Sequence, residues 1–471
     1  MRREGGTARM HYSTQRPNVS GGAAREGDWM AFLHRHLKPF VSTSSLLSLA
    51  RIAGAAAGFA TQVLLARTLH ASALGLFYSV TSLAAVMGMV AALGYPSIAS
   101  RFVSRYREKG RAGLLAAFIA YVRTTVTRSA VLATSVVIAF AVFWPGLELD
   151  ARIATGAAAF AIPAIAAIEL NGSLASSFRR FALAYLPDTC IRPFVLLAAL
   201  LILVALGATL TAPLTAGLFA IIIIGLAVVQ YLLLSRTVPG AEIPETEVPP
   251  RYLRIWRREG PPLVLVALYT SFFADVDILL VTPLLTSADT AIIGICLKMA
   301  LLVGFAVQVA HQVSVPDLAD AHARKEHGHI DTIALKAIGF PLAATLGAML
   351  VVALWGETIL SLFGPDFTGA KVPLLILIGC QLVRALFGPN VALLSVIGAQ
   401  RQNALLAVTA LVVLVLTNLA LVPPLGVVGA ALAVAVATLV WLSACAVVLS
   451  RVSGLRTDAL HVMSRALRER G

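Results

Sequence analysis

The chain has 471 residues, of which 59% are hydrophobic and only 13% are charged, and its formal net charge is +14. Soluble domains carry about 25% charged residues, so this composition excludes a water-soluble globular protein and predicts an integral membrane protein. The basic residues are dispersed at the ends of apolar segments, which argues against nucleic acid as a partner.

The apolar segments indicate helices, because they are continuous rather than alternating. Alternation over runs of about 10 residues would be typical of a transmembrane β-barrel. A polar, basic tail at residues 1–40 lacks a signal-peptide pattern. After it, twelve segments reach the length of about 20 apolar residues that a crossing needs: 41–68, 74–99, 113–144, 153–174, 185–206, 211–235, 262–284, 287–313, 332–355, 372–398, 403–422 and 426–450. The third is too long for one crossing, so its first turns are expected to lie along the membrane surface.

Basic residues predict the orientation. Twelve crossings place both termini on one side, and most Lys and Arg residues outside the spans flank that side. Only Arg67, Arg152 and Lys371 flank the other. Since positive charge stays inside, both termini are predicted to be cytoplasmic. The stretch "SRTVPGAEIPETEVPPRYLRIWRREGPP" reads as a solvated linker. It divides the chain into a basic tail (1–40), an N-lobe (41–236), the linker (237–261), a C-lobe (262–450) and a second basic tail (451–471).

The two lobes contain an internal repeat. "ALGLFYSV" (73–80) and "IIGICLKM" (292–299) each place a glycine early in the second span of a lobe, and "APLTAGLFA" (212–220) corresponds to "PPLGVVGAA" (423–431). Six crossings return the chain to its starting side, so the copies are parallel, as in many secondary transporters. The predicted fold is an all-α polytopic membrane protein, with about 12 transmembrane helices in two six-helix lobes related by this parallel repeat.

The residues resemble a known family. Residues 42–110 look like the opening of the bacterial oligosaccharide (O-antigen-type) flippases, which belong to the multidrug/oligosaccharidyl-lipid/polysaccharide exporter superfamily. The stretches "GETILSLFGPDFTGAKVPLLILIGCQLVRALFGPNVALLSVIGAQRQ" (356–402) and "LVPPLGVVGAALAVAVATL" (421–439) are similar to the family's pattern in its second half. The resemblance covers roughly residues 42–450, and its motifs are structural rather than catalytic.

The resemblance implies a function. Two lobes would surround a central cavity that opens alternately to either face of the bacterial cytoplasmic (inner) membrane. The cargo would be a polyprenyl-diphosphate-linked glycan, turned over from the inner to the outer leaflet for cell-surface polysaccharide biosynthesis. A polysaccharide polymerase and export machinery are expected as partners, beside membrane lipids. No bond chemistry and no cofactor is expected, and the coupling ion would be H⁺ or Na⁺.

Basic residues inside the spans are candidates for contact with the diphosphate. Intramembrane charge is costly and usually faces a cavity. Arg51, ten residues into the first span, shares a helix face with Gln62, and Arg384 shares one with Gln381 and lies near Asn390. Lys298 is the third candidate. The cavity candidates are therefore Arg51, Gln62, Lys298, Arg384 and Asn390; structural ion pairs within a lobe are the alternative, and Arg123 and Arg128 read as residues that extend to the membrane surface.

Two acids, Asp275 and Asp277, lie in the seventh span. Two residues apart on a helix, they point about 200° from each other, so both cannot face the same cavity. Asp277 is preferred for the cavity because the family often has an acid near there. Ion pairing with Lys298 or Arg384, contact with sugar hydroxyls and ion coupling are the competing roles, beside a purely structural one. "DVD" also matches the Asp-x-Asp of glycosyltransferases, but here it lies on a membrane helix.

Two other functions compete with the flippase. An ion-coupled multidrug/cation antiporter of the same superfamily would favour carboxylates over cations in its cavity. A membrane enzyme, such as a polysaccharide polymerase, would show a large outer loop, and none here is large. The histidines in residues 311–329, which are expected to form a hydrated loop, fit no zinc spacing, and the four single cysteines indicate no metal site.

Overall fold

The computed structural model describes residues 43–237, 249–324, 327–397, 399–454 and 459. The predicted tail 1–40, residues 238–248 of the predicted linker and most of the predicted tail 451–471 lie outside the described residues. The chain divides into two units, Met1–Leu49 and Ala50–Gly471. The helix packing, cavities and contacts below all belong to the second unit.

Helices make up every described element, and the described residues contain no strand. The N-lobe contains α2 (Thr43–Thr68), α3 (Ala71–Ala91), α4 (Tyr95–Glu108), α5 (Ala112–Phe143), α6 (Leu149–Ala159), α7 (Ala161–Ser177), α8 (Phe181–Leu186), the π-helix η1 (Pro187–Ile191), α9 (Arg192–Ala205) and α10 (Ala212–Thr237). The third predicted span is the single helix α5, so its expected surface segment is a continuation of the same helix.

The rest of the chain contains α11 (Pro250–Glu259), α12 (Pro262–Thr270), α13 (Phe273–Val281), α14 (Ser287–Ala323), α15 (His327–Ser361), the 3-10 helix η2 (Pro365–Ala370), α16 (Lys371–Phe387), α17 (Asn390–Val396) and α18 (Gln400–Ser453). Residues 311–323, predicted as part of a hydrated loop, are helical and complete α14. The helix α14 therefore extends further than the predicted span 287–313.

Ten helices of the described chain are long and apolar enough to cross a membrane, or eleven if the bent pair α11–α12 and α13 counts as one span. α18 has 54 residues, far more than the about 20 that one crossing needs. Its backbone leaves helical geometry at Gly426, after Pro423 and Pro424, and a Cβ at Gly429 would overlap the Leu421 carbonyl oxygen. The chain therefore turns back within α18, which contains two of the twelve predicted spans. The protein is a multi-pass, all-α membrane protein, as predicted.

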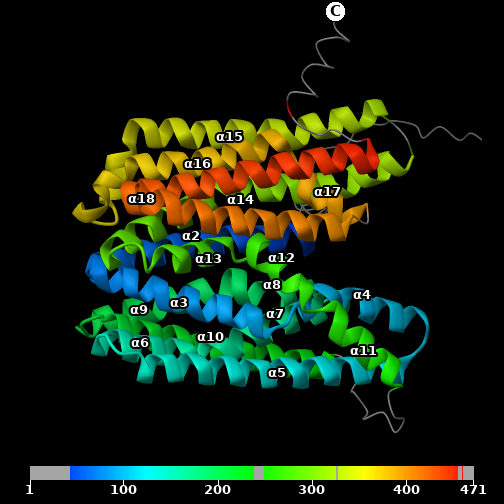
Figure 1. The fold of residues 1–471 in the computed structure, drawn as a ribbon, viewed down its shortest axis with the longest axis horizontal. Helices are drawn as coiled ribbons and strands as arrows, with labels where there is room; N and C mark the ends of the chain where they lie inside the picture. The colour runs from blue at the N-terminus through cyan, green and yellow to red at the C-terminus, as the bar shows by residue number, and fades with distance from the viewer. Residues whose placement is uncertain (1–42, 238–248, 325–326, 398, 455–458, 460–471) are drawn as a thin grey trace, which may run out of the picture. The chain divides into compact units, whose positions relative to one another are not determined.

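Helices of the same lobe pack together. In the N-lobe α7 packs against α3, α4, α5 and α10, and in the C-lobe α16 packs against α14, α15 and α18. Figure 1 shows the C-lobe helices α15, α16 and α18, yellow to red, on the other side of the molecule from the N-lobe helices α5, α6 and α10. α3 and α14 make the most extensive contact between the lobes, and they are the second span of each repeat.

The α3–α14 crossing holds the lobes together at the end where both helices begin. A Cβ at Gly75 would overlap the Ser287 carbonyl oxygen, and one at Gly294 would overlap the Tyr78 ring. These two glycines are the repeat-related pair, so each copy of the repeat supplies one close approach. We call this end of the molecule the closed end.

Hydrogen bonds reinforce the closed end. The hydroxyls of Ser79 and Thr282 are 2.9 Å apart. The Arg67 guanidinium donates to the backbone carbonyls of Leu362, at 2.7 Å, and Ser361, at 2.9 Å. Arg67 is one of the three basic residues that the sequence assigns to the outer side. Its guanidinium joins α2 of the N-lobe to the end of α15 in the C-lobe.

The predicted solvated linker contains a structured helix, α11, anchored to the N-lobe. Trp256 is fully buried, packs on the rings of Phe118 and Tyr121, and donates its indole N–H to the Tyr106 hydroxyl at 2.9 Å. The exposed arginines of α11 lie on the side of the helix away from Trp256, which makes α11 amphipathic. α11 is thus attached to the lobe that precedes it in the chain.

Replacing Trp256 with phenylalanine is expected to destabilise the protein by about 1–2 kcal/mol, because the hydrogen bond to Tyr106 and part of the buried ring are lost. The midpoint of thermal unfolding in detergent measures this. Trp355→Phe is the matched control, since Trp355 is 55% exposed. Equal midpoints for the two variants would show that α11 is not anchored through Trp256.

Candidate functional site

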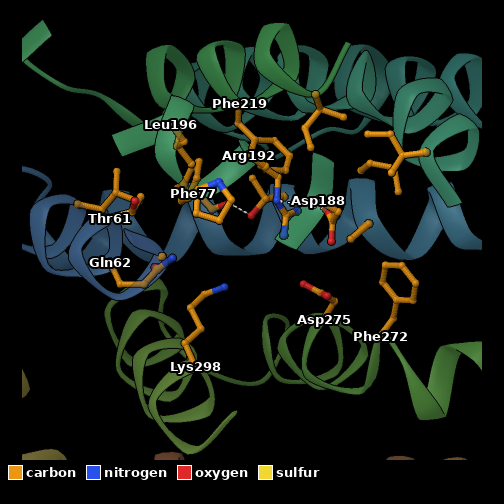
Figure 2. Close-up of a pocket in the computed structure, with 18 of the residues that line it drawn as sticks. Thr61, Gln62, Phe77, Asp188, Arg192, Leu196, Phe219, Phe272, Asp275 and Lys298 are labelled. Carbon is orange, nitrogen blue, oxygen red and sulfur yellow. Dashed lines mark hydrogen bonds and ion pairs between the residues drawn. The ribbon is translucent and has the colours of Figure 1, made fainter. Parts of the chain in front are cut away.

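A cavity of about 470 Å³ lies between the lobes, and we call it the central cavity. Figure 2 shows its lining side chains converging from the helices of both lobes. Its polar lining residues are Thr61, Gln62, Thr81, Glu169, Asp188, Arg192, Ser271, Asp275 and Lys298. The volume is within the range of small-molecule sites, and the many charged groups distinguish it from an apolar packing defect.

The N-lobe wall carries an ion pair. Arg192 Nε lies 3.3 Å from Asp188 Oδ1, and the two side chains are 36% and 42% exposed. Asp188 lies in η1, a π-helical turn bounded by Pro187 and continued by Arg192–Pro193. Such π-turns are rare and frequent at functional sites. Here the turn presents both charged groups to the cavity, where Glu169 of α7 joins them.

The C-lobe wall carries a second pair of opposite charges. Asp275 accepts a hydrogen bond of 2.8 Å from the Ser82 hydroxyl, and Lys298 of α14 lines the same cavity. Lys298 Nζ lies 5.0 Å from the centroid of the Tyr78 ring. The Tyr78 hydroxyl in turn donates to Gln62 Oε1 at 2.6 Å. Figure 2 shows Lys298 and Asp275 pointing toward Arg192 and Asp188.

The central cavity is therefore of mixed sign, with three carboxylates and two basic groups among its lining residues. The sequence predicts a cationic cavity, and the structure corrects this for two reasons. Arg51 does not line the cavity, and the acids Glu169 and Asp188 do. The cavity can present both hydrogen-bond donors with positive charge and acceptors with negative charge.

A break in the seventh span shapes one side of the cavity. α13 is bent by 79° relative to the segment Pro250–Thr270, which ends with α12, and Ser271 and Phe272 at the break line the cavity. Asp275 lies in the first turn of α13. Discontinuous helices near the midplane are typical of transporter binding sites, because they present unpaired backbone groups to the cavity. The continuous seventh helix that the sequence predicts is thus wrong at this point.

A second cavity, of about 330 Å³, lies within the C-lobe and is lined by polar residues that include Thr270, Gln308, His311, Gln312 and Arg384. A narrower cavity of about 160 Å³ shares Ser271 and Asp275 with the central cavity, and Thr270 and Arg384 with the second. The three cavities therefore adjoin one another through the α12–α13 break. Arg384 Nη1 also donates to Gln381 Oε1 at 3.1 Å.

The structure brings some of the predicted site residues to these cavities. Gln62 and Lys298 line the central cavity, and Arg384 lines the two others. Asn390 is buried and is not among the lining residues, although Pro389 and Val391 beside it are. Their binding roles stay predictions.

Arg51 contacts the other lobe instead of the central cavity. Its Nη1 donates to Gln312 Oε1 at 3.3 Å, and its guanidinium lies 5.5 Å from the Phe305 ring centroid. Both partners belong to α14. Arg51 therefore bridges the lobes beside the second cavity, which Gln312 lines.

The two acids of the seventh span are separated as predicted, but in the opposite order. Asp275 lines the central cavity, whereas Asp277 is fully buried and lines none of the three cavities. Asp277 Oδ1 accepts a hydrogen bond of 2.9 Å from the Asn418 amide. The preference for Asp277 as the cavity-facing acid is therefore corrected to Asp275.

Sequence reasoning missed Glu169, Asp188 and Arg192. Glu169 lies inside the predicted fourth span, five residues before its end, so the rule that flags intramembrane charge applies to it. Asp188 and Arg192 fall near the start of the predicted fifth span, where charge reads as flanking. Their signal was the pattern "PDTCIRP", which places opposite charges four residues apart between two prolines.

The structure is similar to solved transporter structures. One is the lipid II flippase MurJ in an inward closed conformation, 14% identical, with 86% of this chain and 87% of that chain covered and a TM-score of 0.62. Another is an inward-facing multidrug resistance MATE family transporter of the MOP superfamily, 14% identical, with coverage of 89% and 98% and a TM-score of 0.59. A third is a MATE in complex with MaL6, 16% identical, with coverage of 90% and 96% and a TM-score of 0.57.

No protein-family model matches the sequence, and no curated protein matches it. The similarity to the solved structures is therefore one of fold. The chain has the fold of the MOP-superfamily transporters.

Proposed function

We propose that this protein is an alternating-access flippase that moves a polyprenyl-diphosphate-linked oligosaccharide from the inner to the outer leaflet of a bacterial cytoplasmic membrane. One observation carries the proposal: the two basic groups of the central cavity, Arg192 and Lys298, come from different lobes. A ligand held by both would couple the lobes to each other, and rocking one lobe against the other around a central site is how such transporters work.

The chemistry of the cavity suits this cargo. A diphosphate cannot enter hydrocarbon, and basic side chains in a site of low dielectric bind it through charge-assisted hydrogen bonds. Sugar hydroxyls need acceptors as well as donors, and Asp188, Asp275 and Gln62 supply acceptors. The lipid tail can stay in the bilayer. No bond is made or broken, so the proposed activity is transport rather than catalysis.

The proposed state of the molecule is inward-facing. The lobes contact each other at the closed end through Gly75, Ser79 and Arg67. The distribution of basic residues predicts that this end faces outward. The cargo would then enter the central cavity from the cytoplasmic leaflet and leave after the closed end separates.

A cation antiporter is the second candidate, because Glu169, Asp188 and Asp275 give the central cavity one more negative group than positive groups. An organic cation would be held by these carboxylates, and Arg192 and Lys298 would repel it. The two candidates thus use the same cavity with opposite electrostatics.

The test is transbilayer movement in proteoliposomes. A fluorescent polyprenyl-diphosphate-linked oligosaccharide is placed in the vesicles, and a membrane-impermeant glycan-binding protein reports how much lies in the outer leaflet. Protein-dependent movement is expected, with no movement of a small organic cation under an imposed pH or sodium gradient. Cation exchange without glycan movement would replace the flippase with the antiporter.

Asp277 is the proposed coupling residue. It is fully buried, and neither its Oδ2 nor Asn418 Oδ1 has a hydrogen-bond donor among the described residues. Two buried acceptors without donors are costly, and a proton or a sodium ion between them would remove the cost. Asp277 lines none of the three cavities described above, which favours coupling over contact with sugar.

Replacing Asp277 with asparagine is expected to abolish the response of glycan movement to a pH or sodium gradient, while movement without a gradient persists. Asparagine keeps the side-chain shape and removes the charge. The same flux assay with and without a gradient measures this, and Asp366→Asn, at an exposed acid, is the control. An unchanged gradient response in Asp277→Asn would make the Asp277–Asn418 pair structural.

A further inference from the structure

A separate cavity of about 560 Å³ lies in the N-lobe, away from the central cavity, and we call it the flank cavity. It is lined by Arg123, Thr124, Val126, Thr127, Arg128, Ala130, Pro163, Ala167, Leu170, Asn171 and Tyr231. α5 and α10 both pack on α7, so α7 forms its floor. Thr124, Thr127, Arg128 and Tyr231 are exposed, and the cavity therefore opens at the protein surface.

The flank cavity is positively charged. Arg123 and Arg128 line it, and none of its lining residues is acidic. The central cavity differs, because its basic groups are offset by three carboxylates. A cavity with two arginines and hydroxyl and amide side chains provides the donors that bind phosphate oxygens.

Arg123 is held inside this cavity. Its guanidinium lies 4.9 Å from the centroid of the Tyr231 ring on α10, so it spans the gap between α5 and α10. Its Nε is buried and has no hydrogen-bond partner among the described residues. A side chain that merely extends to water would leave its polar atoms hydrated. The sequence interpretation of Arg123 as such a residue leaves its buried Nε unexplained, and an anionic ligand in the cavity would supply a partner.

The depth of the cavity in the bilayer fits a lipid headgroup. At 1.5 Å per residue, Arg123 lies roughly 30 Å along α5 from Phe143. Tyr231 lies roughly 29 Å along α10 from Ala212, and Asn171 roughly 33 Å from Leu149. The hydrocarbon core is about 30 Å thick. If the opposite helix ends mark one boundary of the core, all three side chains lie at the other boundary, where lipid phosphates are found.

We propose that the flank cavity binds the phosphate of an anionic phospholipid through Arg123 and Arg128, with the acyl chains in the surrounding bilayer. Basic pockets between membrane helices are a recognised type of lipid site. An anionic headgroup is favoured over a zwitterionic one, because no acidic lining residue would pair with the ammonium group. The proposal does not depend on which cargo occupies the central cavity.

Native mass spectrometry tests the proposal on the full-length protein, released from nanodiscs that contain equal amounts of phosphatidylglycerol and phosphatidylethanolamine. The wild type is expected to retain one phosphatidylglycerol in preference to phosphatidylethanolamine. In Arg123→Gln/Arg128→Gln the retained fraction is expected to fall by about tenfold or more, because two charge-assisted hydrogen bonds are lost. Arg105→Gln/Arg236→Gln is the matched control, since it removes the same charge at exposed positions outside the cavity.

Three results would overturn the proposal. The first is equal retention by the wild type and the cavity variant, and the second is an equal loss in the control variant, which would mean unspecific attraction. The third is displacement of the lipid by millimolar inorganic phosphate, which would assign the cavity to a soluble anion. A measurement on the wild type alone tests the proposal if the variant misfolds. The midpoint of thermal unfolding of the wild type should rise with the mole fraction of phosphatidylglycerol, and a constant midpoint would also contradict the proposal.

Discussion

Replacing Lys298 with glutamine is expected to slow movement of the polyprenyl-diphosphate-linked oligosaccharide by about 10- to 100-fold. Lys298 lines the central cavity opposite Arg192, and a hydrogen bond to a charged group contributes about 1.5–3 kcal/mol, where 1.4 kcal/mol is a factor of ten. The variant also leaves Arg192 as the one basic residue among the described residues that line the central cavity, beside the carboxylates of Glu169, Asp188 and Asp275. The remaining negative charge would then repel the diphosphate.

The two candidate functions predict opposite effects of Lys298→Gln on binding of the cargo. In a cation antiporter Lys298 repels the cargo, so Lys298→Gln should strengthen cation binding and Asp275→Asn should abolish it. In the flippase Lys298→Gln is the damaging change, and Lys298→Arg should restore part of the movement because it keeps the charge. The two flux assays on these three variants therefore separate the candidates without knowledge of the glycan.

Lys336→Gln is the control for Lys298→Gln, because Lys336 is exposed on α15 and the change removes the same charge. It should leave movement of the glycan unchanged. If Lys298→Gln and Lys336→Gln behave alike, the cavity does not bind the diphosphate through Lys298, and the flippase proposal loses its main support.

The helical fold could be predicted from sequence because hydropathy and length are local properties. Each predicted apolar segment corresponds to one helix or to consecutive helical elements, and the last two segments are parts of α18. The position of the break in the seventh span was not predictable in this way. No proline or glycine lies between Leu263 and Leu279, so the sequence contains no helix-breaking residue that would predict the end of α12 at Thr270.

The site could be predicted only in part because it depends on where helices meet. The opposite directions of Asp275 and Asp277 follow from helix geometry alone. Which of the two faces the cavity depends on the packing of α13 against α3 and α18, which no local pattern encodes. Asp188 and Arg192 were missed for a related reason: they read as the edge of a span until η1 places them in the cavity wall.

The second large effect is expected from a substitution at the α3–α14 crossing of the closed end. Replacing Gly75 with alanine is expected to lower the population of the conformation with the closed end intact by about tenfold or more. The added Cβ would overlap the Ser287 carbonyl oxygen, a backbone atom that cannot rotate away. Overpacking of this kind costs about 1–3 kcal/mol. The crossing must widen, and the hydrogen bonds of Ser79 and Arg67 nearby would be strained or lost.

Gly294→Ala should have a smaller effect than Gly75→Ala, because its Cβ would meet the Tyr78 ring, a side chain that can shift if it gives up its bond to Gln62. Gly379→Ala, on α16, meets no atom within 4 Å and should have none. The order of these three variants follows from what each new methyl group would contact. It does not follow from helix propensity, which favours alanine equally at all three positions.

Distances between spin labels at Glu148→Cys and Glu357→Cys, measured with Cys190→Ser, report on separation of the closed end. Both residues are exposed. Glu148 directly precedes α6, which packs on α3, and Glu357 lies four residues before Ser361, which contacts Arg67. In the wild type a single short distance should dominate, and Gly75→Ala should shift the distribution to a longer one. A transporter must visit both states, so a variant driven into one state loses flux although its cavity residues are intact. If Gly75→Ala kept the short distance and normal flux, the α3–α14 crossing would be a permanent interface, and alternation would have to occur elsewhere, with the α12–α13 break as the next place to look.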